Sequence, residues 1–251
     1  MDLLPRSGRY CLGAAVAASG LMQIVNAAFV RLVPKLPEWL PAQQPAAVAV
    51  GVALVLIGAA IITGYKTRVA ALGLAGLLLM TFGFRLPEMA ANSGALVNPA
   101  KILALLGGAV LVGGRGEKWP WVAPVLFGIF FLICGWAHFQ YSGFVDSMVP
   151  AWIPPGQRFW TYFTAVALLA GGVGVILPPT RWLAGILSGV MIFLWLLVLH
   201  IPLALKKHNA FELAGVFEAL ALTGVAGLIA ASATATPPAT RPDQAIEGGA
   251  H

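Results

Sequence analysis

Residues 189–199 read Gly-Val-Met-Ile-Phe-Leu-Trp-Leu-Leu-Val-Leu, and residues 70–80 read Ala-Ala-Leu-Gly-Leu-Ala-Gly-Leu-Leu-Leu-Met. Neither run alternates apolar and polar residues, as a transmembrane β-strand does. A helix that spans a bilayer needs about 20 mostly apolar residues, and it satisfies its backbone hydrogen bonds internally. The two runs therefore predict membrane-spanning helices.

The composition extends this prediction to the whole chain. Hydrophobic residues make up 59% of it and charged residues only 10%, whereas a soluble domain carries about 25% charged residues. The net charge of +6 comes from basic residues scattered singly or in pairs near the predicted helix ends. That pattern does not resemble a nucleic-acid footprint. The expected partner is the lipid bilayer and not nucleic acid.

Hydropathy and proline-rich connections divide the chain into eight predicted spans. The tail, residues 232–251, has no apolar period and is rich in Pro and Gly, so it is predicted to be disordered. The predicted spans cover residues 9–33, 46–64, 68–86, 99–114, 119–141, 157–177, 181–204 and 211–231.

The two halves of the chain share an internal repeat. The pattern Pro-x-Trp-x-Pro at 37–41 recurs at 150–154, and Thr67-Arg68 recurs as Thr180-Arg181, both at an offset of 113. Such matches in one register favour a duplication. The remaining matches are Gly58 with Gly171 and Ala71 with Ala184 at that offset, and Gly20 with Gly135 and Pro87 with Pro202 at an offset of 115.

We therefore predict a tandem duplication of a four-helix unit, with residues 1–117 as the first repeat and 118–231 as the second. An even number of spans makes both copies enter the bilayer from the same side, which relates them by a pseudo-two-fold axis along the membrane normal. The predicted fold is an all-α membrane protein of eight transmembrane helices in two parallel four-helix bundles. Basic residues are slightly more numerous on the N-terminal side of the spans, which favours a cytoplasmic N-terminus.

Ionisable residues inside the predicted spans are candidates for function, because each costs about 2.5–3.5 kcal/mol at the centre of a membrane helix. The second half contains His138, His200, Glu212 and Glu218. Histidine titrates near neutral pH and can pair with a carboxylate, so His138, His200 and Glu218 suit proton exchange. A bis-histidine haem between His138 and His200 is an alternative that no other feature of the sequence calls for.

The first half carries polar residues at the matching places. Gln23 aligns with His138, Arg85 with His200, and Lys101 with Glu218, while Asn26 lies close to Gln23. We predict two polar pockets, of which the first suits an anion or a carbonyl oxygen. The alternative is that long side chains near helix ends reach the interface and that the others bond neighbouring carbonyls.

Two tryptophans, Trp39 and Trp152, occupy the Pro-x-Trp-x-Pro segments. Tryptophan is enriched at headgroup level, so both are predicted to be interfacial anchors, with a lid over the pockets as the alternative. The sequence contains no metal motif, nucleotide-binding loop or nucleophile elbow, and no metal site is predicted. The depths of Cys11 and Cys134 in their spans predict two separate thiols.

Several short motifs resemble the DoxX family of four-helix bacterial membrane proteins, more closely in the second half than in the first. The family often carries a glutamate in its second helix, which the second and sixth spans lack, so we carry over only His200 and Glu212. The motifs are residues 135–139 (Gly-Trp-Ala-His-Phe), residues 149–154 (Val-Pro-Ala-Trp-Ile-Pro), residues 179–181 (Pro-Thr-Arg), His200 and residues 208–212 (His-Asn-Ala-Phe-Glu).

This resemblance implies a bacterial inner-membrane protein that acts in quinone-linked sulfur oxidation or with partner redox enzymes in oxidative-stress complexes. The first hypothesis is a membrane component that binds a quinone headgroup or small acid. The second is a permease or channel for small solutes or anions, and the third is a scaffold for a partner enzyme. The sequence leaves open whether the chain is an enzyme; we expect no activity of its own and consider it a candidate oxidoreductase subunit.

Overall fold

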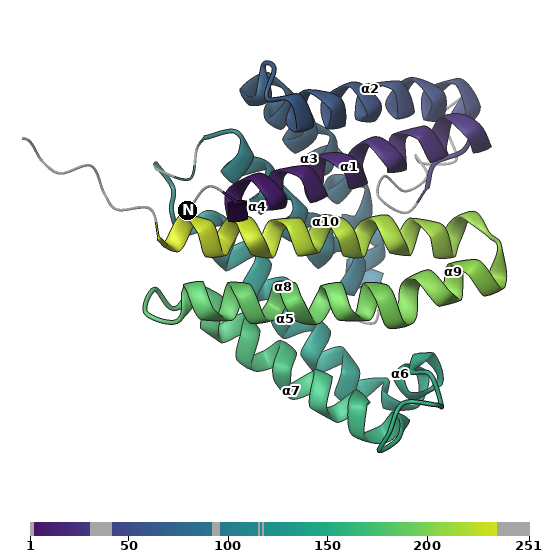
Figure 1. Cartoon of the computed structure of the whole chain (residues 1–251). Helices are drawn as coiled ribbons and strands as arrows, with labels where there is room; N and C mark the ends of the chain where they lie inside the picture. Colours follow the sequence, from purple (N-terminus) through teal and green to yellow (C-terminus); the bar gives the residue numbers. More distant parts are fainter. Residues whose placement is uncertain (1–2, 31–41, 92–95, 115, 117, 235–251) are drawn as a thin grey trace, which may run out of the picture.

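The computed structural model describes residues 3–30, 42–91, 96–114, 116 and 118–234, and these residues form helices with no strand among them (Figure 1). The all-α prediction is therefore confirmed. The predicted disordered tail lies outside the described residues from 235 onward. In chain order the helices are α1 (Leu3–Asn26), α2 (Gln43–Thr63), α3 (Thr67–Ala91), α4 (Val97–Val112), α5 (Val122–Gln140), α6 (Ser142–Met148), α7 (Gln157–Ile176), α8 (Arg181–Trp195), the π-helix η2 (Leu196–His200), α9 (Ile201–Lys207) and α10 (Ala210–Ala233).

Six of the described helical segments are long and apolar enough to cross a membrane. They are α2, α3 as far as Pro87, α5, α7, the continuous segment Arg181–Lys207, and α10. The other two predicted spans correspond to α1, which is not among these six, and to α4, which is apolar but has only 16 residues. A multi-pass membrane protein is thus supported, while the number of eight spans is not confirmed.

The helices form two groups that are joined through their last members. Within the first half α1 packs on α2, α2 on α3 and α3 on α4, and within the second half α5 packs on α7, α7 on α8 and α8 on α10. However, α4 also packs on α5, α10 packs on α1, and α4 and α10 contact each other. The fourth helix of each half therefore contacts the first helix of the other half, so the bundles are not separate.

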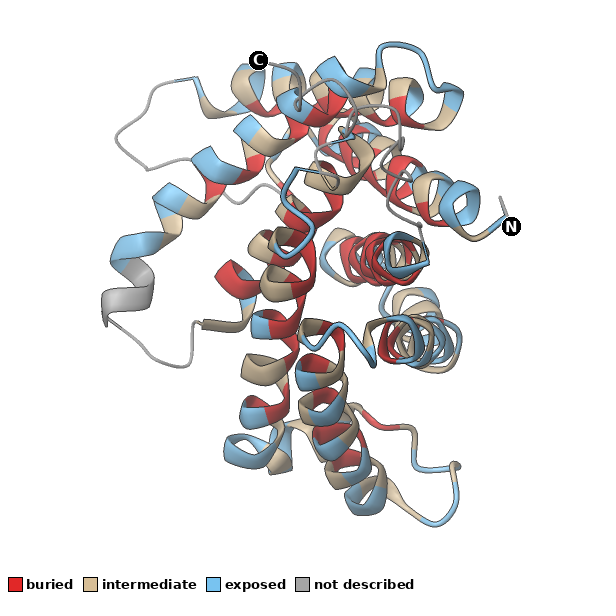
Figure 2. Cartoon of the chain, turned by 90° about the vertical axis from the view of Figure 1, so that its left-hand side faces the viewer, coloured by how far each residue is buried: buried red, intermediate tan, exposed pale blue. Residues whose placement is uncertain are grey.

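Helix α10 is the most enclosed of the candidate spans. Buried residues make up 61% of its apolar window, compared with 28% for α2. Its inner residues are small, such as Ala214, Gly215 and Gly224, which lets neighbouring backbones approach closely. Figure 2 shows buried residues on the inward helix faces and exposed ones on the outside. Large apolar side chains cover that outside, as expected in lipid.

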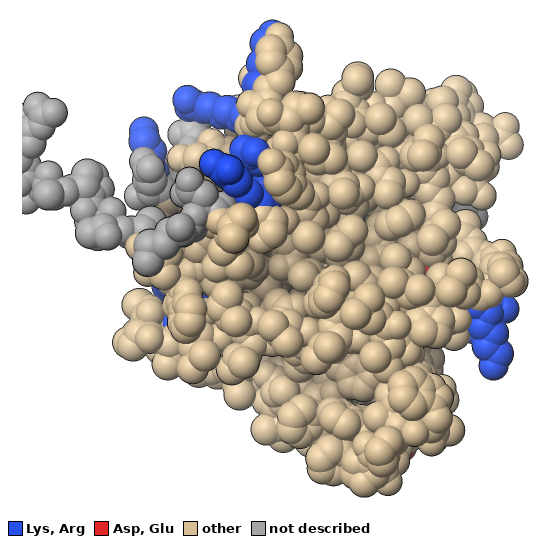
Figure 3. All heavy atoms as spheres, in the orientation of Figure 1, with Lys and Arg blue, Asp and Glu red and all other residues tan. Residues whose placement is uncertain are grey.

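The distribution of charge agrees with a membrane position. In Figure 3, Lys and Arg gather at the end of the molecule that holds the N-terminus, with a smaller group at the opposite end and an apolar band between them. A bilayer would be contacted by that band, and the charged ends would lie at headgroup level. The two cysteines, Cys11 and Cys134, are not bonded to each other, as predicted.

Candidate functional site

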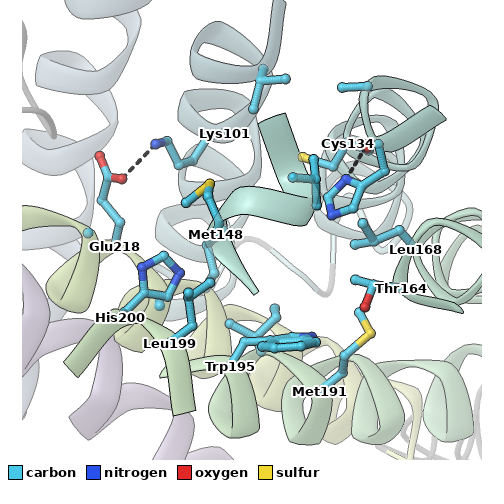
Figure 4. Close-up of a pocket in the computed structure, with 18 of the residues that line it drawn as sticks. Lys101, Cys134, Met148, Thr164, Leu168, Met191, Trp195, Leu199, His200 and Glu218 are labelled. Carbon is cyan, nitrogen blue, oxygen red and sulfur yellow. Dashed lines mark hydrogen bonds and ion pairs between the residues drawn. The ribbon is translucent and has the colours of Figure 1, made fainter. Parts of the chain in front are cut away.

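A cavity of about 760 Å³ lies in the second half, between α4, α5, α6, α7, the α8–η2 segment and α10 (Figure 4). Most of its wall is apolar or aromatic. Phe130 and Phe131 come from α5, Trp160 and Leu168 from α7, and Trp195 from the end of α8. The site is therefore an apolar chamber whose few polar groups can orient a ligand.

One side of the cavity carries a buried ion pair. The Nζ of Lys101, on α4, donates to the Oε2 of Glu218, on α10, across 2.6 Å. The exposed fractions of these side chains are only 11% and 6%. Removing either charge would leave the other unpaired in a poorly solvated place. Figure 4 shows that Glu218 and Lys101 point toward one another, and His200 lines the same cavity.

His200 reaches the cavity from the π-helix η2, of which it is the last residue. This short π-helix interrupts the segment between α8 and α9. A π turn is rare in proteins and occurs frequently at functional sites. The sequence Leu-Leu-Val-Leu-His contains nothing that distinguishes it from an ordinary apolar helix, so sequence reasoning missed this feature.

His138 lies on another wall of the cavity. Its Nδ1 donates to the backbone carbonyl oxygen of Cys134, one helical turn earlier on α5, at 2.8 Å. Because a carbonyl oxygen only accepts, Nδ1 carries the proton, and Nε2 of the neutral ring is an acceptor. Thr164, on the adjacent α7, also lines the cavity. The chamber thus has polar groups on at least two walls with aromatic surface between them.

The short helix α6 closes part of the cavity with Phe144 and Met148. It is fixed to the start of α7, because the Nη1 of Arg158 donates to the Oδ2 of Asp146 at 2.9 Å. The nearby Thr161 hydroxyl and the Arg158 guanidinium hold the pKa of the Asp146 carboxyl below its ordinary value. The position of this wall therefore depends on an ionised Asp146.

Three of the predicted residues of the second half, His138, His200 and Glu218, are brought together as expected. Lys101 joins them, although we predicted it in the first-half pocket. The reason is that α4 packs against the second half. Glu212 does not line the cavity. Its carboxylate accepts from Lys207 Nζ at 2.6 Å, and its backbone N–H donates to the Oδ1 of Asn209, so it stabilises the start of α10.

The other residues of the predicted first-half pocket do not line the cavity that contains Lys101. Gln23 is fully buried, and within the described part of the chain its amide has no hydrogen-bond partner. The Nδ2 of Asn26 donates to the Met22 carbonyl oxygen of its own helix at 2.7 Å. Arg85 is half-buried on α3. None of Gln23, Asn26 and Arg85 lines the cavity described above.

Of the two predicted interfacial tryptophans, Trp152 does not line the cavity. Trp152 is 73% exposed, a position that suits an interfacial anchor, and Trp39 lies outside the described residues. A tryptophan that we did not single out, Trp160, lines the cavity and donates from Nε1 to the Pro154 carbonyl oxygen at 2.9 Å. Among the described residues, no group of three or more His, Cys, Asp or Glu could hold a metal ion.

Two family models match parts of the chain. Residues 5–86 match the DoxX family model. The predicted resemblance to DoxX is therefore confirmed for these residues, but they lie in the first half, whereas the motifs that suggested the resemblance lie mainly in the second. Residues 127–221, which contain most of the cavity, match a domain of unknown function, DUF8561. No curated protein and no solved structure gives a significant match to this DoxX-like chain.

Proposed function

We propose that the protein is the binding component of a quinone-linked redox or stress-response system, and that its cavity holds a quinone headgroup or a small acid. The observation that carries this proposal is the buried Lys101–Glu218 pair on the wall of an aromatic cavity of about 760 Å³ that His200 also lines. Ligand pockets in proteins typically measure about 300–1,000 Å³.

The chemistry of the walls fits a planar ring with carbonyl oxygens. Lys101 and His200 can donate hydrogen bonds to such oxygens, His138 Nε2 can accept one from a quinol hydroxyl, and Lys101 could equally hold a carboxylate. Trp160 and Trp195 offer aromatic faces against which a ring can stack. The surrounding apolar wall suits a lipid-soluble molecule that partitions from the bilayer.

The role of the chain in this proposal is binding and proton exchange. Reduction of a quinone to a quinol takes up two electrons and two protons. We assign the electrons to a partner redox enzyme and the exchange of protons to His138 and His200, because imidazole titrates near neutral pH. Placement in the bacterial inner membrane with a cytoplasmic N-terminus is part of the proposal, and the basic end in Figure 3 supports that orientation.

The test is quinone retention by the purified full-length protein, measured by organic extraction, together with titration of a soluble quinone analogue followed by tryptophan fluorescence. We expect His200→Ala and Glu218→Gln to weaken binding by about tenfold or more, which corresponds to about 1.4 kcal/mol. Matched controls are His208→Ala and Glu212→Gln, since neither residue lines the cavity. Quinone content and affinity that are unchanged in both cavity variants would refute the proposal.

The same preparations test the two alternatives. A permease or channel predicts flux of small anions into liposomes that contain the protein, and this flux should be lost in the cavity variants. A scaffold predicts a stoichiometric partner enzyme that co-purifies with the chain while no ligand is bound. Quinone retention without anion flux would favour the binding component.

A further inference from the structure

The buried ion pair joins two positions that correspond between the halves. Lys101 and Glu218 are separated by 117 residues, and so are Gly108 and Val225. The second pair is also in contact, since a Cβ added to Gly108 would lie 2.5 Å from Val225 Cγ2. The pairs stand about two helical turns apart, so α4 and α10 run parallel and in register. Corresponding positions that touch each other lie on a two-fold axis.

The contacts between helices are the same when each helix of one half is replaced by its counterpart in the other half. We replace α1 by α5, α2 by α7, α3 by α8 and α4 by α10. The α1–α2 contact then becomes α5–α7, the α3–α4 contact becomes α8–α10, and the α1–α10 contact becomes α5–α4. The contact between α4 and α10 maps onto itself. This is the pattern of a two-fold dimer in which the fourth helix of each unit packs against the first helix of the other unit.

The closest backbone approaches repeat residue by residue. A Cβ on Gly13 would lie 3.0 Å from the Gly58 carbonyl oxygen, and one on Gly128 would lie 2.8 Å from that of Gly172. By these contacts Gly58 corresponds to Gly172, whereas the sequence match pairs it with Gly171. The other repeated contacts are Gly20–Gly51 with Gly135–Ala165, Gly8–Gly224 with Ala123–Gly107, and Ala71–Gly113 with Gly185–Ala230.

The π-helix η2 explains a change in spacing between the halves. The offset from α3 to α8 is 114 residues at Ala71 and Gly185, but 115 at the matched prolines Pro87 and Pro202. The second half therefore has one additional residue between these points. Residues Leu196–His200 lie in that interval, and a π turn holds more residues than an α turn.

The cavity does not repeat in the same way. The positions that correspond to His138, Leu168 and Trp195 are Gln23, Leu54 and Thr81, which are 0%, 0% and 1% exposed. These first-half side chains are enclosed by protein, whereas their second-half counterparts line open space. The chamber of the second half is thus not matched at these three first-half positions, and one of its walls bears Lys101 from the first half.

We infer that the chain is a fused dimer with exchanged fourth helices, whose pseudo-two-fold axis passes through the Lys101–Glu218 pair, and that the cavity described above is built across the junction. The axis gives the two members of the pair equivalent backbone positions on α4 and α10. Exchanging the two residues should therefore regenerate the same ion pair. This inference does not depend on the identity of the ligand.

The experiment is charge reversal in the full-length protein, with thermal unfolding in detergent as the readout. Lys101→Glu and Glu218→Lys each place like charges together, and each should lower the unfolding midpoint by about 10 °C. The double reversal should return the midpoint to within about 3 °C of the original protein. Because no ligand is measured, the result stands whether or not quinone binding is found.

The control is the same double reversal at Lys207 and Glu212, which are also 2.6 Å apart but do not correspond between the halves. There the exchange puts a negative charge at a helix C-terminus and a positive charge at an N-terminus, both unfavourable, so it should not restore stability. A reversed Lys101–Glu218 pair that is no more stable than the single variants would overturn the inference. Failure of that double variant to fold would also overturn it, provided that replacing both residues by leucine gives a folded protein.

Discussion

Replacing Lys101 by methionine tests how strongly the buried pair holds the two halves together. Methionine keeps the length of the side chain but removes the charge, and Glu218, only 6% exposed, would lose its cation. Breaking a buried pair by removing one partner costs about 3–5 kcal/mol. In a chain of this size that corresponds to a fall of about 6–20 °C in the unfolding midpoint.

The comparison is Lys207→Met, which breaks an ion pair of the same length whose lysine is 50% exposed. Exposed pairs contribute about 0.2–1 kcal/mol, so this variant should change the midpoint by at most about 4 °C. The assay is unfolding of purified protein in detergent by heat and by added SDS. Removing both charges, as Lys101→Met with Glu218→Leu, should recover most of the loss because no unpaired charge remains. Equal destabilisation by Lys101→Met and Lys207→Met would refute the reasoning.

Three further predictions use the same preparations. Gln23→Leu removes a buried amide without a hydrogen-bond partner in the described chain, and should raise the free energy of unfolding by about 1–3 kcal/mol; a loss of stability would contradict this. Gly224→Val would place side-chain atoms against the Gly8 carbonyl oxygen, which lies only 2.6 Å from an added Cβ, and should lower the free energy of unfolding by about 1–3 kcal/mol or more. Its control is Gly76→Ala, where no atom lies within 4 Å of an added Cβ, and this variant should stabilise α3 by up to about 1 kcal/mol. Since the pKa of Asp146 is lowered in the folded protein, its contribution is present above the ordinary aspartate pKa of about 3.9 and is lost as pH falls further. The ratio of the affinity of the original protein for the quinone analogue to that of Asp146→Asn should therefore be constant from pH 7 to about 5 and should fall toward one below about 4, as measured by tryptophan fluorescence.

The helical membrane fold could be predicted because long apolar runs have few other solutions. The exchange of the fourth helices could not, because the apolar faces of α4 and α10 do not identify their neighbours. This difference explains the wrong placement of Lys101. A repeat in the sequence groups residues by half, whereas the three-dimensional arrangement brings α4 to the other half.

Site residues could be predicted where a polar side chain stands in an otherwise apolar helix. His138, His200 and Glu218 are polar in apolar helices, and all of them line the cavity. Aromatic wall residues such as Trp160 resemble ordinary membrane-belt residues, so the sequence offered no signal for them. For Glu212 a signal existed: Asn209 stands three residues before it, a spacing typical of a helix N-terminus.

The contact between Lys101 and Glu218 also distinguishes one chain with two copies from two identical chains. In a symmetric pair of identical subunits, a residue on the axis meets its own counterpart, so a lysine would face a lysine. Opposite charges at such a point require the copies to be encoded separately. In the fused dimer that we infer, joining two units in one gene therefore permits a chemical asymmetry at the axis that self-association of identical chains forbids.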